Sequence, residues 1–369
     1  MKQLQARYRV WGVVCLAAAM LVGSAFGASS LESLKAGKAT LKSAGAMAFG
    51  PEGILFVGDS MGAAVVALDT QDRTSVAAAP AIEVKSINEK IAGLLGSAPD
   101  QILINDVAVN PLSKNVYISV SRGRGPEAAP VILRVDATGK ISELALDGIR
   151  YSSVSLVDAP EDVKDQRGQS KRTEAITGLA YLNGKVIVAG LSNEEFSSNL
   201  RSIPFPFQTA VKGASIEIFH GSHGRFETNS PVRTFVAYSI NNEPNILAAY
   251  TCTPLVRIPV SELTPGNKVK GRTIAELGNR NRPLDMIVYQ KDGHNYILMA
   301  NSSRGVMKLA TDNLEGYKPI TAQTEVTGVP YETIASLKGV QHLDKYDQSN
   351  ALILAGDGGK LDLRSIPLP

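Results

Sequence analysis

The segment 44–69, AGAMAFGPEGILFVGDSMGAAVVALD, contains three short apolar runs separated by two turns. The runs AMAF, ILFV and AVVAL are rich in valine, isoleucine and phenylalanine, which favour β-strands. Pro51, Gly53 and Gly58 stand in the turns, where proline presets φ and glycine readily adopts positive φ. A unit of three strands joined by tight turns predicts a small antiparallel sheet.

The same arrangement of strands and turns recurs along the chain. The units are spaced at intervals of roughly 45 to 70 residues, in the range of β-propeller blades. They cover 44–69, 106–141, 175–221, 245–263, 283–312 and 340–366. The sequence therefore predicts one all-β domain over 28–369, a six-bladed β-propeller with helical and loop insertions. The segment 139–175 leaves room for a seventh blade, and ring closure would pair an early strand with 351–365.

Three insertions interrupt this pattern. In 86–103, apolar residues recur at helical spacing after Ser86, with Glu89 three residues later, which predicts a helix with a capping box. The segment 158–173 is charged and poor in apolar residues, so we expect a surface loop. The aromatic segment 193–208 is interpreted as a cap or flap over one face of the propeller.

The first 27 residues have the three parts of a signal peptide. Lys2, Arg7 and Arg9 precede an apolar run of 13 residues at 10–22, and small residues follow at 23–28. The run is shorter than the roughly 20 residues that span a membrane. We expect cleavage after Gly27, a periplasmic or secreted product, and no stable membrane insertion after cleavage.

Charge and cysteine content limit the partners. The chain has 38 basic and 35 acidic side chains, and three of the basic ones lie in the predicted signal peptide. The mature chain is then neutral and has no basic block, which argues against a nucleic-acid partner. We expect a small molecule or a periplasmic or extracellular protein instead. Cys252 is the single cysteine of the mature chain, so no internal disulfide can form.

The segment 50–69, GPEGILFVGDSMGAAVVALD, resembles the blade motif of NHL-repeat and gluconolactonase-like β-propellers. In that motif a glycine turn precedes a strand and an aspartate-bearing turn follows it. The resemblance covers this blade and, more loosely, 106–141, and it implies the fold. Gluconolactonase-like enzymes hold a divalent metal on the central axis with a glutamate, asparagines and an aspartate, but this set does not match the present sequence residue by residue.

A histidine-rich segment is the first candidate site. His220 and His223 are three residues apart and Glu227 follows, a set that can bind zinc, copper or non-haem iron. Cys252 joined to the two histidines would make a copper-type ligand set. The alternatives are a hairpin whose histidines bind backbone carbonyls, general-base catalysis by a histidine, and a buried, unreactive Cys252.

The second candidate site follows from propeller geometry, because the leading ends of the inner strands converge on one mouth of the central channel. Oxygen ligands from several blades suit calcium, and converging carboxylates can raise a pKa enough for general-base catalysis. The alternative is that these groups solvate the channel or hold strand ends together. The candidate catalytic residues are Asp106, Glu174 and Asp285, and the candidate ligand-binding residues are Asn105, Asn281, Arg282 and Arg233.

Two functions are consistent with these features. The sequence lacks a GxSxG elbow, a Walker loop, a dinucleotide fingerprint, and HExxH and CxxCH motifs, so the first hypothesis is a module that binds a small ligand or a protein. The second is a metal-dependent enzyme. It would be either a lactonase-like hydrolase on the axial carboxylates or a copper redox protein using His220, His223 and Cys252. The metal of such an enzyme would be calcium, zinc or copper.

Overall fold

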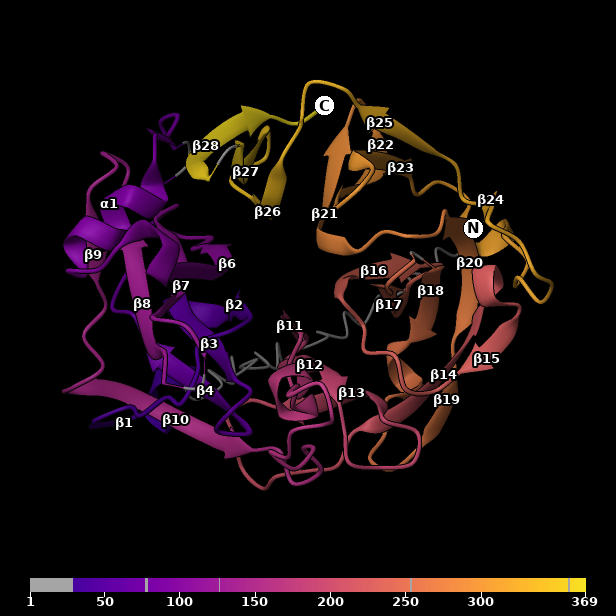
Figure 1. Cartoon of the computed structure of the whole chain (residues 1–369), viewed down its shortest axis with the longest axis horizontal. Coiled ribbons are helices and arrows are strands. Elements are labelled where there is room, and N and C mark those ends of the chain that lie inside the picture. Colours follow the sequence, from indigo (N-terminus) through magenta and orange to yellow (C-terminus); the bar gives the residue numbers. More distant parts are fainter. Residues whose placement is uncertain (1–28, 77–78, 126, 253, 358) are drawn as a thin grey trace, which may run out of the picture.

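A computed structural model of the chain describes residues 29–76, 79–125, 127–252, 254–357 and 359–369. The predicted signal peptide therefore lies outside the described residues. The described chain forms six β-sheets around a central axis, a six-bladed β-propeller (Figure 1). No helix in the part that the structure describes is long and apolar enough to cross a membrane.

The first three blades are built from residues 35–227, with one further strand from residues 268–270. Each has its inner strand at the axis and its outer strands at the rim. Blade 1 contains β1 (Lys35–Gly37), β2 (Met47–Phe49), β3 (Ile54–Asp59), β4 (Ala64–Asp69) and β10 (Ile149–Ser155); blade 2 contains β6 (Ile102–Val109), β7 (Val116–Arg122), β8 (Ala129–Val135) and β9 (Ile141–Glu143); blade 3 contains β11 (Gly178–Leu182), β12 (Lys185–Leu191), β13 (Ser198–Pro204), β14 (Ala214–His220), β15 (Arg225–Glu227) and the added β19 (Lys268–Lys270).

The other three blades follow in chain order, and the last one is completed by an early strand. Blade 4 contains β16 (Thr234–Ile240), β17 (Glu243–Ala249), β18 (Pro254–Pro259), β20 (Arg272–Leu277) and β24 (Val326–Gly328); blade 5 contains β21 (Pro283–Lys291), β22 (His294–Asn301), β23 (Gly305–Ala310) and β25 (Tyr331–Ile334); blade 6 contains β26 (Val340–Lys345), β27 (Asn350–Asp357), β28 (Lys360–Pro367) and β5 (Glu83–Val84).

The ring is closed by pairing of β28 with β5, in which Leu363 lies opposite Val84. This confirms the predicted pairing of an early strand with the C-terminal segment. The segment 139–175 adds no seventh blade. Its strands β9 and β10 are instead the outer strands of blades 2 and 1.

The blades do not follow one another around the ring in chain order. The inner strands β6, β2, β11, β16, β21 and β26 are neighbours in that sequence, and β26 packs against β6 to complete the circle (Figure 1). Blade 1 therefore lies between blades 2 and 3. The chain leaves blade 1 after β4, adds β5 to blade 6, builds blade 2, and returns to add β10 to blade 1.

The core consists of six apolar clusters, one at each interface between neighbouring blades. Strand β3 shows how the sequence produces them. Because successive side chains point to opposite faces of a sheet, Leu55 and Val57 pack against blade 2 while Ile54 and Phe56 pack against blade 3. A strand covered on both faces reads as a continuous apolar run, as ILFV does.

The insertions differ in part from expectation. Helix α1 (Ile87–Leu94) confirms the predicted helix, but the Ser86 side chain makes no cap hydrogen bond, so the capping box was wrong. The segment 193–208 is not a flap, because it contains β13 and its Phe205 is buried in the core. The segment 158–173 begins in the core, where Asp158 is buried against Arg201 with 2.8 Å between Oδ1 and Nε.

All inner strands begin at the same face of the propeller, which we call the entry face. In an antiparallel blade the second strand ends at this face, and so does the fourth. The turn between β17 and β18 in blade 4 and the end of β14 in blade 3 therefore lie on the entry face as well.

Candidate functional sites

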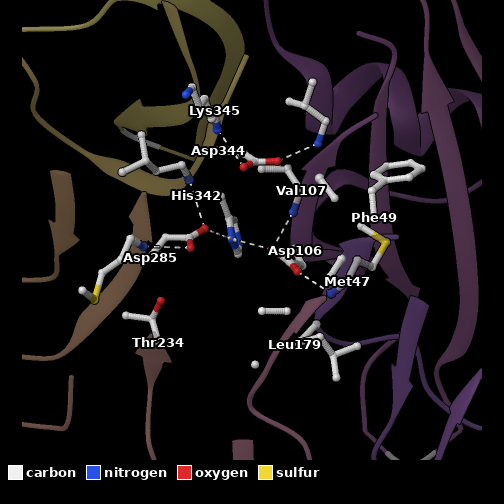
Figure 2. Close-up of a pocket in the computed structure, with 18 of the residues that line it drawn as sticks. Met47, Phe49, Asp106, Val107, Leu179, Thr234, Asp285, His342, Asp344 and Lys345 are labelled. Atoms are coloured by element: carbon white, nitrogen blue, oxygen red, sulfur yellow. Dashed lines mark hydrogen bonds and ion pairs between the residues drawn. The ribbon is translucent and has the colours of Figure 1, made fainter. Parts of the chain in front are cut away.

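A cavity of about 700 Å³ lies on the axis and is lined by the inner strands of all six blades. Three of its residues form a cluster of titratable side chains, Asp106, Asp285 and His342, which we call the channel cluster (Figure 2). They come from the inner strands of blades 2, 5 and 6, which are neighbours at the closure of the ring.

Each residue of the channel cluster directly follows an irregularity in its strand. The register of the inner strand with its partner shifts immediately before Asp106, before Asp285 and before His342. A β-bulge places an extra residue in one strand and re-aims the side chain beside it. The three bulges turn these side chains toward one another in the channel.

His342 lies between the two carboxyl groups (Figure 2). Its Nδ1 is 3.8 Å from Oδ1 of Asp106 and also 3.8 Å from Oδ2 of Asp285. These distances are longer than a hydrogen bond but short enough for strong charge interaction. One ligand atom from each residue lies within 4.8 Å of the others, so the cluster has the size of a cation site.

The carboxylates also connect neighbouring blades. Oδ2 of Asp106 accepts a hydrogen bond from the backbone N–H of Met47 in blade 1 at 2.6 Å. Oδ2 of Asp285 accepts one from Leu343 in blade 6 at 3.1 Å. Asp344 does the same between blades 6 and 2, where its Oδ2 accepts from Val109 at 2.7 Å. These acids therefore have a structural role in addition to any binding role.

Burial changes the pKa values of the side chains in the channel cluster. Desolvation and the neighbouring Asp285 raise the pKa of Asp106 to about 8, although His342 acts in the opposite direction. Desolvation lowers the pKa of His342, but the carboxyl groups of Asp285 and Asp106 outweigh it and the net pKa is raised. The cluster can therefore hold or give up protons near neutral pH.

The structure separates the predicted channel residues into two groups. Asn105, Asp106, Asp285 and Arg233 line the cavity. The other three, Asn281, Arg282 and Glu174, do not belong to its described lining.

The polar contacts of these residues explain their places. Nδ2 of Asn105 donates to the carbonyl of Ala44 at 2.8 Å, and Nδ2 of Asn281 donates to the carbonyl of Gly278. Glu174 accepts from Nη1 of Arg233 at 2.5 Å, so its carboxylate holds the arginine at the rim. Arg282 lies near both, and burial followed by the charge of Arg233 lowers its pKa.

The second site is the histidine cluster, formed by His220, His223, Glu227 and Cys252. One ring nitrogen of each histidine and Sγ of Cys252 lie within 4.8 Å of one another. Glu227 accepts hydrogen bonds from Nδ1 of His220 at 2.9 Å and from Nδ1 of His223 at 2.6 Å. These bonds keep the carboxylate charged and lower its pKa to about 2. The sequence therefore named four residues that the fold brings together.

Sequence reasoning missed His342 and Asp344. Both stand in QHLDKY, the inner strand of the last unit, where a buried strand would be apolar. Two polar residues at alternate positions in such a strand place both side chains on the same face. That pattern is the signal that could have identified them.

Comparisons with known proteins find only distant structural similarity. No protein-family model and no curated protein sequence matches the chain. Among solved structures, a putative oxidoreductase (glucose dehydrogenase) from Thermus thermophilus is 11% identical with a TM-score of 0.35, covering 90% of this chain and 100% of its own. The PQQ-bound aldose sugar dehydrogenase from Streptomyces coelicolor is 10% identical with a TM-score of 0.31, covering 90% and 96%. Drosophila plexin A, in complex with semaphorin 1b, is 11% identical with a TM-score of 0.37, covering 91% and 87%.

These similarities are too low to carry a functional argument. The propeller fold is shown by the six sheets themselves.

Proposed function

We propose that this propeller binds a small polar ligand in its central channel, with Asp106, Asp285 and His342 as the binding residues. The observation that carries the proposal is the cavity of about 700 Å³ on the axis, into which three blades direct titratable side chains. Ligand sites are usually preformed cavities of this size with a few converging polar groups.

The chemistry of the lining indicates the class of ligand. Asp106 and Asp285 each use backbone N–H donors for part of their hydrogen-bonding capacity, and a carboxyl group has further lone pairs for a ligand. His342 adds a donor between them. Hydroxyl and amino groups are therefore the ligand groups that fit the cluster. Arg233 also lines the cavity and can donate hydrogen bonds to an oxygen of the same molecule.

The test is a calorimetric and thermal-shift screen of the full chain against monosaccharides, aldonolactones and small amines. A ligand bound in the channel should lose about 1.5–3 kcal/mol of binding free energy in Asp285→Asn, because the variant lacks the charge-assisted hydrogen bond. Asp136→Asn, in an exposed turn of blade 2, is the matched control. A ligand that binds Asp285→Asn and His342→Gln as tightly as the unmodified protein would contradict the channel as the site.

A metal-dependent hydrolase is the second candidate. The observation that favours it is the position of His342 Nδ1 at 3.8 Å from both carboxylates, a spacing that a shared divalent cation could bridge. Calcium, manganese and zinc should then each be tested for activation of aldonolactone hydrolysis. Hydrolysis that is absent with all three ions, or that persists in Asp285→Asn, would exclude this function.

We further propose that the protein works in the periplasm or outside the cell. The support is the composition of residues 1–27 and the single cysteine that follows them. The partner in this compartment is a small molecule or another exported protein. Mass spectrometry of the mature N-terminus from an export host tests the proposal, with Ala28 expected as the first residue. An intact N-terminus in the cytoplasmic fraction would contradict it.

A further inference from the structure

The histidine cluster lies between blades 3 and 4, away from the channel cluster and built from different elements. His220 ends β14, and His223 belongs to the short 3-10 turn Gly221–His223 that follows. Cys252 belongs to the turn between β17 and β18 of blade 4. Two turns from neighbouring blades therefore place an imidazole pair opposite a thiol.

Glu227 determines which histidine nitrogens remain available. Nδ1 of His220 and Nδ1 of His223 both face its carboxylate, so Nε2 is the free nitrogen of each ring. Metal-binding histidines usually donate their second ring N–H to a carboxylate, which sets the tautomer and the ring orientation. Here one carboxylate does this for two rings, whose centroids are 3.9 Å apart.

Nε2 of His220 is buried and has no hydrogen-bond partner among the described residues. The residue is only 3% exposed, so bulk water does not reach this atom freely. Buried polar atoms without partners are rare, and each one calls for an explanation such as an ion or a ligand. A cation bound at Nε2 would supply the missing partner.

Backbone geometry holds the thiol at this place. Cys252 has a φ of +61°, which is unusual for a residue with a side chain, and its N–H donates to the carbonyl of Asn281 at 2.8 Å. On the opposite side, a Cβ at Gly221 would come within 2.7 Å of Cγ of Glu276, so only glycine allows the histidine turn to approach blade 4 so closely. Both turns thus adopt conformations that bring the ligands together.

We infer that His220, His223 and Cys252 form a three-ligand site for a thiophilic d¹⁰ metal ion, Zn²⁺ or Cu⁺, with Glu227 as the positioning carboxylate. Two imidazoles and one thiolate suit these ions, whereas calcium and magnesium require oxygen ligands. Binding releases the thiol proton to solvent. His223 is 44% exposed, so the ion can enter from the entry face and a fourth ligand can be added there. The inference does not depend on the proposed channel function.

The experiment uses the full chain after removal of metal with a chelator. Zn²⁺ is titrated against a chromophoric zinc indicator, Cu⁺ against bicinchoninate, and Co²⁺ is used as a spectroscopic probe for a thiolate-to-cobalt charge-transfer band. We expect one equivalent bound, with the band lost in Cys252→Ser and the stoichiometry lost in His220→Ala. Glu227→Gln should weaken binding by about 10- to 100-fold while the band remains. The dissociation constants for Zn²⁺ and Cu⁺ from the two competition titrations show which ion the site prefers.

Two controls keep the test decisive. His294→Ala removes an exposed histidine that pairs with Asp312 elsewhere, and it should leave binding unchanged. His342→Gln removes the imidazole of the channel cluster and should also leave the cobalt band unchanged. Circular dichroism melts show whether each variant is folded, and Cys252→Ser, at a partly exposed turn, is the variant least prone to misfolding. Binding that survives in folded Cys252→Ser, or that is lost in His342→Gln, would overturn the inference.

Discussion

The channel cluster and the histidine cluster are built in opposite ways. The channel cluster comes from three inner strands, and its aspartates are already hydrogen-bonded to backbone N–H groups of neighbouring blades. The histidine cluster comes from the end of β14, the turn that follows it, β15 and a turn of blade 4, and it leaves the buried Nε2 of His220 without a partner in the described chain. The channel cluster therefore stabilises the ring as well as facing a cavity. The histidine cluster has ligand atoms that no other group uses.

This difference predicts how strongly a substitution in each cluster affects the stability of the fold. A site on strands is rigid, but its residues cannot be changed without loosening the blades that they join. A site on turns can be altered with little effect on the fold, because turns contribute few core contacts.

Deletion of 361–369 should abolish folding of the whole domain. The deletion removes most of β28, which pairs with β27 and β5 and closes the ring. The expected loss is comparable to the total stability of a domain, about 5–15 kcal/mol. Circular dichroism and dye binding to exposed apolar surface would measure it. Replacement of the exposed residues 161–168 by a Gly/Ser linker is the control of similar length, and a truncated protein that melts like this control would show that closure does not hold the ring.

Asp106→Ala should destabilise the protein by about 2–5 kcal/mol, because it leaves two N–H groups, of Met47 and Val107, without an acceptor. His223→Ala, in the exposed turn of the histidine cluster, should destabilise the metal-free protein by only about 0.5–1.5 kcal/mol, because Glu227 loses one hydrogen bond but keeps that of His220. Urea unfolding of both variants measures the contrast. An equal decrease in the free energy of unfolding in the two variants would show that the channel cluster and the histidine cluster contribute equally to stability.

The pH dependence of stability should decrease in Asp106→Asn. The folded protein keeps a proton on Asp106 up to about pH 8, whereas the unfolded chain releases it near pH 4, so the free energy of unfolding falls as pH rises between these values. The raised pKa of His342 acts in the same direction, and loss of the Asp106 charge reduces that shift too. Urea unfolding at pH 5 and pH 8 measures the slope. Asp165→Asn, in an exposed loop, should retain the full slope, and an unchanged slope in Asp106→Asn would contradict the assignment.

The smallest effect is expected at Cys252. Its left-handed backbone costs a residue with a side chain about 1–2 kcal/mol, and glycine avoids that cost while losing about 0.5–1 kcal/mol of chain entropy. Cys252→Gly should therefore stabilise the metal-free protein by about 0.5 kcal/mol. Cys252→Ala keeps the strain and should not show this gain. A Cys252→Gly variant less stable than Cys252→Ala would mean that the turn is not strained.

Much of the fold could be predicted from the sequence, because strand and turn signals are local. The run ILFV at 54–57 is apolar on both faces, and this pattern indicates a strand packed between two other blades. The interpretation of 193–208 as a cap or flap was wrong, because prolines and aromatic residues also occur in a strand at the core. Its strand β13 is recognised only by pairing with β12, a contact that composition does not encode.

The histidine cluster was largely predictable as well. His220, His223 and Glu227 lie within eight residues, so local chain geometry alone brings them near one another. Only two of the three residues of the channel cluster could be proposed from the sequence. Asp106 and Asp285 could be proposed from their places at strand starts, but His342 is 236 positions from Asp106 and meets it only when the ring closes.

The strands, their turns and the short-range grouping of two histidines with a carboxylate could be predicted from the chain alone, because each depends on residues close together in it. The order of the blades, with blade 1 between blades 2 and 3, and the identity of β5 as the early strand that closes blade 6 are seen only in the folded protein. The same is true of the three bulges that turn Asp106, Asp285 and His342 toward the axis. These features depend on packing between segments far apart in the chain, and that packing is settled only when all six blades close around one core.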